Sequence, residues 1–118
     1  MPSRTEILNN LLLCNSPVTE LLRNLTDYSW DSEEELVTLK ASHVDNILSR
    51  FLQGELSVKD VETWANAIEG REDIAIDPVN FGLVQDSIFE LANPDITVQL
   101  TMASAEKLRV KLTMKQAN

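Results

Sequence analysis

The chain has few of the residues that catalytic and metal sites need. Its 118 residues include one cysteine, Cys14, and one histidine, His43. A single cysteine excludes an intrachain disulfide, and zinc sites usually need three or four Cys and His ligands. A Ser-His-Asp or Cys-His site would depend entirely on His43, which we expect to be exposed in the first turn of a helix. Cys14 follows three leucines and is predicted to be a small core residue.

Long apolar runs and glycine-rich loops are also missing. The longest apolar run is LLLC at residues 11–14, whereas a membrane-spanning helix needs roughly 20 apolar residues. Residues 1–10 contain one arginine and no apolar stretch typical of a secretory signal. The three glycines are scattered, which excludes a glycine-rich phosphate loop. We therefore expect a cytoplasmic protein without a membrane span or a cofactor.

The composition is that of an ordinary globular domain. Hydrophobic residues make up 43% and charged residues 25% of the chain, close to the average for folded proteins. The length suits one domain. We predict a single all-helical domain over residues 1–118, with residues 115–118 as a frayed tail.

Helix start signals recur along the chain. Cap residues are predicted in six places: Ser3 with Glu6, Ser16 before Pro17, Ser42 with Asp45, Ser57 with Asp60, Asp77 before Pro78, and Thr101. Apolar residues follow each cap at helical spacing, and Trp64 lies on one of these stripes. The fold class predicted is therefore an all-α bundle of five to six short amphipathic helices.

Two segments are ambiguous. Residues 36–39 could form either a helical turn or a short strand, because periodicity cannot decide over four residues. We favour the helical turn there. Residues 96–100 alternate between apolar and polar side chains and could also be extended.

The net charge of −9 is concentrated in the middle of the chain. Residues 31–95 carry fifteen acids and four bases, whereas residues 96–118 carry one acid and four bases. Such a body repels nucleic-acid phosphates and attracts a basic partner. The helix pair around Gly54 has the outline of a helix-turn-helix, but its second helix presents mainly acids, which disfavours DNA binding.

Carboxylates leave one catalytic alternative open. Glu69, Glu72, Asp73 and Asp77 could collect a hard cation such as magnesium, as in a helical metal-dependent hydrolase. The all-α nucleoside triphosphate pyrophosphohydrolases have paired glutamates followed three residues later by a third acid. After Glu33, Glu34 and Glu35 that pattern needs an acid at residue 37 or 38, and neither is one.

Protein binding fits the acids better. The two densest acidic segments are residues 31–35, next to Trp30, and residues 69–73, close to Trp64. Aromatic anchors inside a polar rim are common at interfaces. The predicted partner-binding residues are Trp30, Asp31, Glu33, Glu34, Glu35, Glu62, Glu69, Glu72 and Asp73. A regulatory or structural subunit without activity of its own is a further alternative, and the sequence leaves the oligomeric state open.

Two short stretches resemble bacterial immunity proteins. RFLQGELSVKDVETWANAI, from Arg50, resembles the colicin D type in Phe51, Leu52, Glu55, Leu56, Ser57 and Val61, and DSEEELV, from Asp31, is similar to the acidic helix start of DNase-colicin immunity proteins. Together they cover about a quarter of the chain. The resemblance implies an all-helical acidic protein that inhibits a nuclease toxin by covering its basic substrate-binding surface.

Overall fold

Six helices and a two-stranded sheet make up the described part of the chain. The structure is a computed structural model that describes residues 3–26 and 34–116, with side chains up to residue 113. In chain order the elements are α1 (Arg4–Leu13), α2 (Val18–Leu25), β1 (Val37–Leu39), α3 (Ala41–Leu52), α4 (Val58–Ile68), β2 (Ile74–Ile76), α5 (Phe81–Ala92) and α6 (Met102–Gln116). The predicted helical bundle is confirmed, and the helices pack as one globule.

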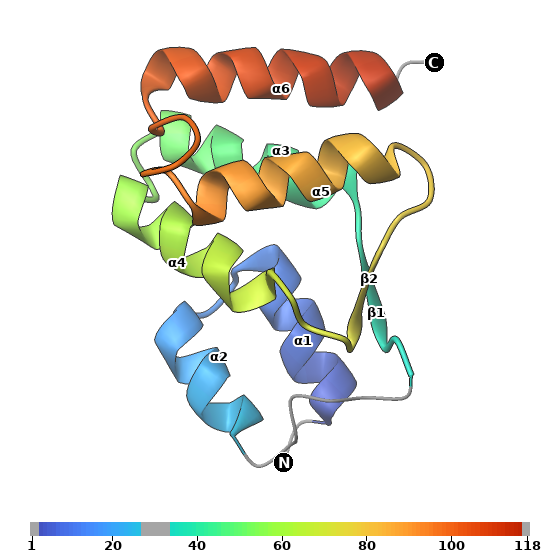
Figure 1. Ribbon diagram of the computed structural model, residues 1–118. Helices are drawn as coiled ribbons and strands as arrows, with labels where there is room; N and C mark the ends of the chain where they lie inside the picture. Colours follow the sequence, from blue (N-terminus) through green and yellow to red (C-terminus); the bar gives the residue numbers. More distant parts are fainter. Residues whose placement is uncertain (1–2, 27–33, 117–118) are drawn as a thin grey trace.

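The helices stack in layers along the long axis of the molecule. α6 lies over α3 and α5 at one end, and α1 and α2 pair at the other (Figure 1). α4 packs against α5 and also contacts α2, so it joins the two ends. α6 continues to Gln116, two residues into the segment that the sequence assigns to a frayed tail.

The helical turn favoured for residues 36–39 is wrong, and the extended alternative is right. Residues 37–39 form β1, which pairs in parallel with β2 so that Val37 lies opposite Ile74 and Leu39 opposite Ile76. The sequence treats residues 71–76 as a connector, because local periodicity cannot reveal a partner strand more than 30 residues away.

The second segment considered for a strand, residues 96–100, forms turns and loop instead. The Thr97 hydroxyl hydrogen-bonds the carbonyls of Glu90 at 2.9 Å and Asn93 at 2.7 Å. These contacts fold the segment back onto the end of α5, and no strand partner lies beside it among the described residues.

Three of the six predicted caps are confirmed, at Ser3, Ser57 and Thr101. Ser16 does not cap α2, because the helix begins at Val18 after Pro17 and has no side-chain cap. Ser57 Oγ accepts from the Asp60 amide at 3.0 Å, and Asp60 Oδ2 accepts from the Ser57 amide at 2.9 Å, which is a complete capping box. Thr101 Oγ1 accepts from the Ser104 amide at 3.1 Å at the start of α6. Such caps satisfy donors that the first helical turn leaves unpaired.

The cap predicted for α3 is wrong. The helix begins at Ala41, one residue before Ser42, and the side chain that closes its first turn is His43. His43 Nδ1 accepts a hydrogen bond from the Lys40 amide at 2.9 Å. His43 is half-buried rather than exposed, and burial, together with the charge of Lys40, lowers its pKa.

α5 starts three residues later than the Asp77-Pro78 signal predicts. Asp77 Oδ1 accepts from the Val79 amide at 3.0 Å and so forms a local turn. Asn80 follows with φ of +65°, a left-handed conformation that asparagine tolerates better than most residues. The helix therefore begins at Phe81.

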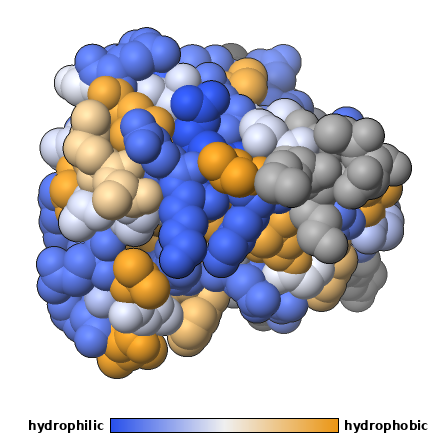
Figure 2. All heavy atoms as spheres, turned by 90° about the horizontal axis from the view of Figure 1, so that it is seen from above, coloured by the Kyte–Doolittle hydropathy of each residue, from blue (hydrophilic) through white to orange (hydrophobic). Residues whose placement is uncertain are grey.

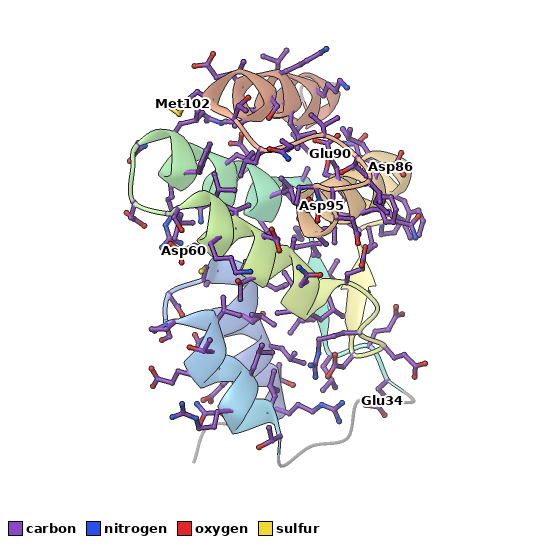
Figure 3. The ribbon with its side chains drawn as sticks, turned by 60° about the vertical axis from the view of Figure 1, so that its left-hand side comes forward. Glu34, Asp60, Asp86, Glu90, Asp95 and Met102 are labelled. Atoms are coloured by element: carbon purple, nitrogen blue, oxygen red, sulfur yellow. The ribbon has the colours of Figure 1, made fainter. Side chains whose placement is uncertain are left out.

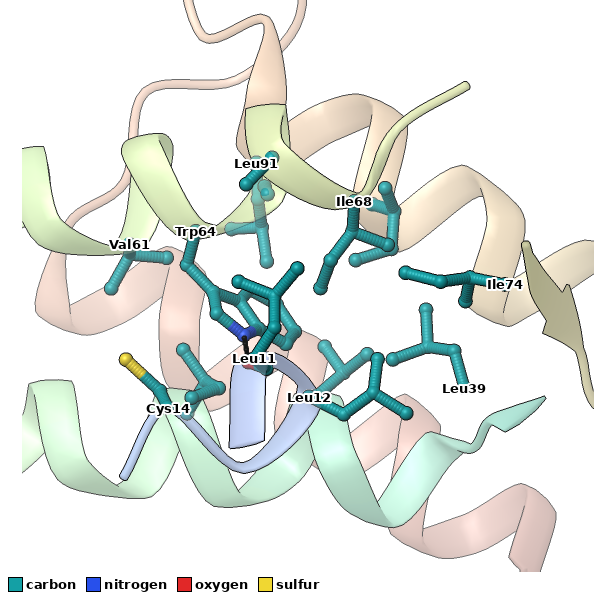
Figure 4. Packing of buried hydrophobic residues seen from close by; sticks show 14 of the residues in the cluster. Leu11, Leu12, Cys14, Leu39, Val61, Trp64, Ile68, Ile74 and Leu91 are labelled. Atoms are coloured by element: carbon teal, nitrogen blue, oxygen red, sulfur yellow. Dashed lines mark hydrogen bonds between the residues drawn. The ribbon is translucent and has the colours of Figure 1, made fainter. Parts of the chain in front are cut away.

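Trp64 anchors the core, as its stripe predicts. The side chain has no exposed surface, and its indole Nε1 donates to the Leu11 carbonyl at 2.8 Å (Figure 4). Cys14 is also buried, and burial raises the pKa of its thiol, an inert state that agrees with a structural role. None of the described helices combines the length and apolar character needed to cross a bilayer.

Candidate partner-binding surface

The segment from Glu69 to Asp73 contains a buried ion pair. Asp73 has 0% and Arg71 has 7% of its surface exposed. Arg71 Nε donates to Asp73 Oδ1 and Nη2 donates to Oδ2, both at 2.9 Å. This two-point contact between guanidinium and carboxylate is the strong geometry for such pairs. The interior therefore holds two charges that the sequence presents as part of an acidic surface run.

A second arginine reaches the same carboxylate from α1. Arg4 Nε and Nη2 lie 3.0 and 2.9 Å from Asp73 Oδ2. Burial raises the pKa of the Asp73 carboxyl, but the hydrogen bonds from Arg71 and Arg4 outweigh that effect, so the pKa is lowered. Asp73 stays ionised inside the protein and ties α1 to the end of α4.

Asp73 is therefore a wrong assignment among the predicted partner-binding residues. A residue without exposed surface cannot contact a partner, and both of its carboxylate oxygens accept from arginines. Its backbone also has a structural role, because its carbonyl accepts from the Leu36 amide at 2.8 Å. No local sequence signal separates Asp73, which directly precedes β2, from the exposed Glu72 beside it.

The parallel ladder brings the two acidic segments together. Since Val37 lies opposite Ile74, the residues just before β1 lie beside those just before β2. Glu34 and Glu35 on one side and Glu72 on the other are exposed at this corner. Trp30, Asp31 and Glu33 lie outside the described residues.

The two remaining predicted residues are half-buried on or just after α4. Glu62 lies 3.7 Å from Lys59, a surface ion pair of little energetic value. Glu69 ends the helix, and its carboxylate oxygens accept from Asn93 Nδ2 at 3.2 and 3.4 Å. Asn93 thus fixes the position of the Glu69 carboxylate, whereas a fully solvated acid would have no such contact.

A hollow of about 340 Å³ opens beside Glu69, between the end of α4, β2 and α5. Its floor is apolar and consists of Leu39, Ile68, Ile74, Ile76 and Ile88. Glu69, Gln85 and Asp86 supply polar groups, and the partly exposed ring of Phe89 lies beside them. We call this feature the β2 hollow. Nothing in the sequence reveals it, because it is assembled from elements distant in the chain.

α5 presents aromatic rings outward. Phe81 and Phe89 are each 47% exposed, although the sequence places both on the apolar stripe of this helix. The inward residues are Val84, Ser87, Ile88, Leu91 and Ala92. Phe81, Gln85 and Phe89 follow one another at intervals of four, so they share the outer face of the helix. Aromatic residues on a polar face are typical anchors of interfaces.

Acids surround this face of α5 as well. Asp86, Glu90 and Asp95 lie near one another on and after α5, well away from Glu34, three residues before β1 (Figure 3). Viewed from the α6 side, the molecule shows mostly hydrophilic residues, with apolar ones in small groups (Figure 2). The α5 face therefore combines acids, exposed rings and a hollow, whereas the α6 face does not show one continuous apolar patch.

The catalytic alternative loses one of its four carboxylates, because Asp73 is buried and held by Arg71 and Arg4. Among the described residues no group of three or more His, Cys, Asp or Glu side chains could hold a metal ion. Comparison of the chain with protein-family models, with curated proteins and with solved structures finds no match. The function must therefore be argued from the surface itself.

Proposed function

We propose that the protein is a non-catalytic, acidic binding module that covers a basic surface of another protein. The contact face consists of the β2 hollow and the outer side of α5. The observation that carries the proposal is the pair of carboxylates, Glu69 and Asp86, beside an apolar hollow flanked by the exposed ring of Phe89.

The charge of the contact face supports a basic partner. The segment 31–95 supplies every element of the face and carries fifteen acids against four bases. One of those bases, Arg71, lines the hollow but is held by Asp73. An acidic face gains association rate and specificity from a partner of opposite charge, while the apolar floor and rings supply affinity.

Within this class, an immunity or antitoxin role is the proposal that the sequence resemblance favours. A nuclease toxin presents lysines and arginines to phosphate, so an acidic helical inhibitor would compete for the same surface. The corner formed by Glu34, Glu35 and Glu72 would extend the acidic face beyond the hollow. The partner would then be a basic protein encoded close to this one.

The test begins with the products of the neighbouring genes, each purified and titrated against the protein by calorimetry. With a binding partner in hand, the double variant Glu69→Lys/Asp86→Lys should weaken binding by at least about tenfold, since close interfacial charge pairs contribute about 1.5 kcal/mol or more each. A steep loss of affinity with salt should accompany wild-type binding.

A matched control uses an acid on the opposite end of the molecule. Glu20 is exposed on α2, so Glu20→Lys reverses a charge without touching the α5 face and should leave affinity nearly unchanged. Binding that is equally sensitive to Glu20→Lys would indicate a general effect of net charge. Binding that ignores the double variant would rule out the α5 face as the contact site.

A further inference from the structure

The outer edge of β2 has no partner strand in the described structure. The sheet contains only β1 and β2 among the described residues. β2 bonds to β1 through the Asp73 carbonyl, which accepts from Val37, and through the Asp77 amide, which donates to Leu39 at 2.9 Å. Because backbone groups alternate along a strand, the N–H and C=O groups of Ile74 and Ile76 point away from β1.

These outward groups remain unpaired within the described residues. Outside the β1–β2 ladder, no backbone hydrogen bond joins Ile74 or Ile76 to another described residue, although Ile74 is buried and Ile76 is half-buried. A buried backbone group without a partner is costly, so native structures rarely leave one. A strand edge without a partner strand is also the standard template for adding a further strand.

The hollow lies where an added strand would place its side chains. Ile74 and Ile76 are opposite Val37 and Leu39, and both isoleucines line the hollow. A neighbouring strand about 4.8 Å away would direct every second side chain to this same face. An apolar side chain of the added strand would thus be positioned over the apolar floor.

Charge fixes the chemistry of the occupant. Glu69 and Asp86 line the hollow, while the cationic Arg71 is paired with Asp73. Lysine or arginine residues flanking the apolar side chain would meet these carboxylates, and acidic flanks would be repelled. A second copy of this chain would bring its own acidic body, with a net charge of −9, against the same rim.

We infer that the β2 edge and its hollow receive an extended segment of the basic partner, which adds to the sheet as a third strand. This inference rests on the proposed function and specifies how the partner is held. The main-chain bonds to Ile74 and Ile76 supply register, an apolar side chain fills the hollow, and flanking cations pair with Glu69 and Asp86.

The test uses the unmodified protein, labelled with ¹⁵N, and a designed peptide as the probe. Its sequence is acetyl-Lys-Lys-Val-Thr-Ile-Thr-Val-Lys-Lys-amide. On titration we expect amide shifts along β2 and α5, and slowed hydrogen exchange at the amides of Ile74 and Ile76. Exchange protection at those two amides is specific, because simple charge attraction to the rim would not produce it.

Two N-methylated peptides provide the matched control. One carries methyl groups on the amides of the valines and isoleucine, and the other on those of the threonines. Only one of these two sets of amides can face β2 in the added strand. Methylation of that set should weaken binding by about tenfold or more, and methylation of the other set should be tolerated. Equal binding by both patterns would overturn strand addition.

Two further outcomes also decide against the inference. Protection of Ile74 and Ile76 in concentrated protein without peptide would show that a second copy occupies the edge. If the natural partner depends on Glu69 and Asp86 but leaves these two amides unprotected, strand addition fails while the proposed function stands. If the double variant leaves partner binding intact, the α5 face is ruled out as the contact site, and strand addition beside it fails as well.

Discussion

Neighbouring residues of one short segment have opposite environments in this protein. Arg71 and Asp73 are buried and paired with each other, whereas Glu72 between them is exposed and Glu69 lines the β2 hollow. In the sequence all four belong to one charged run. The structure separates charges that hold the fold together from charges that are available to a partner, and the ion pairs of Asp73 with Arg71 and Arg4 mark the buried ones.

The largest expected effect comes from breaking the buried half of this comparison. Asp73→Asn removes a negative charge that Arg71 and Arg4 both contact, leaving two guanidinium groups without their carboxylate. Removing one partner of a buried ion pair typically costs about 3–5 kcal/mol. We therefore expect the free energy of unfolding, measured by urea denaturation, to fall by about that amount.

The adjacent residue is the matched control for this change. Glu72→Gln removes the same charge from an exposed position and should alter stability by no more than about 0.5 kcal/mol. Similar losses for the two variants would mean that Asp73 is not held as the structure shows, and the division of the segment into buried and exposed charges would be wrong.

A second, smaller effect concerns the buried hydrogen bond of Trp64. Trp64→Phe removes the indole N–H that donates to the Leu11 carbonyl. That carbonyl keeps its bond from the Cys14 amide at 3.1 Å, so we expect the lost hydrogen bond to cost about 1 kcal/mol. Circular dichroism should follow the denaturation, because the substitution removes a fluorophore. Phe89→Leu, on the exposed face, should change stability by less. A Trp64→Phe variant as stable as wild type would contradict the assigned bond.

The pH dependence of stability gives a third prediction. Burial lowers the pKa of His43 from its usual 6.5, so on acidification the unfolded chain takes up the proton first. The contribution of neutral His43 to the free energy of unfolding is complete above about pH 6.5. This contribution is lost as the pH falls through the lowered pKa of the folded state. His43→Glu keeps an acceptor for the Lys40 amide and should flatten this slope just below about pH 6.5. An unchanged slope would assign it to other groups.

The helices were largely predictable because their signals are local. Ser57 with Asp60 and the stripe through Trp64 lie within a few turns of each other, so cap and core could be read from spacing alone. The strands were not predictable in this way, because residues 37–39 become extended by pairing with residues 74–76. Short elements of this kind depend on tertiary contacts that no periodicity records.

The candidate site was predictable only in its chemical character. An excess of acids indicated a basic partner, but charge density cannot tell Asp73 from Glu72, because contacts with Arg71 and Arg4 bury the first and leave the second exposed. Phe81, the first residue of α5, and Phe89, at the edge of its apolar stripe, lie on the surface rather than in the core. The β2 hollow needed the packing of three separate elements.

The smallest effects are expected on the exposed half of the comparison, and here their sign is informative. Glu69 follows the last residue of α4, where a negative charge opposes the helix dipole, whereas Glu20 lies in the first turn of α2, where it favours the dipole. Glu69→Lys should therefore leave stability within about 0.5 kcal/mol of wild type, because the dipole gain offsets the lost contact with Asn93. Glu20→Lys should lower it by about 0.3–1 kcal/mol. Thermal unfolding at low salt would resolve the two. If Glu69→Lys lowers stability more than Glu20→Lys does, Glu69 stabilises the fold. Its position beside the β2 hollow would then be explained without a binding partner.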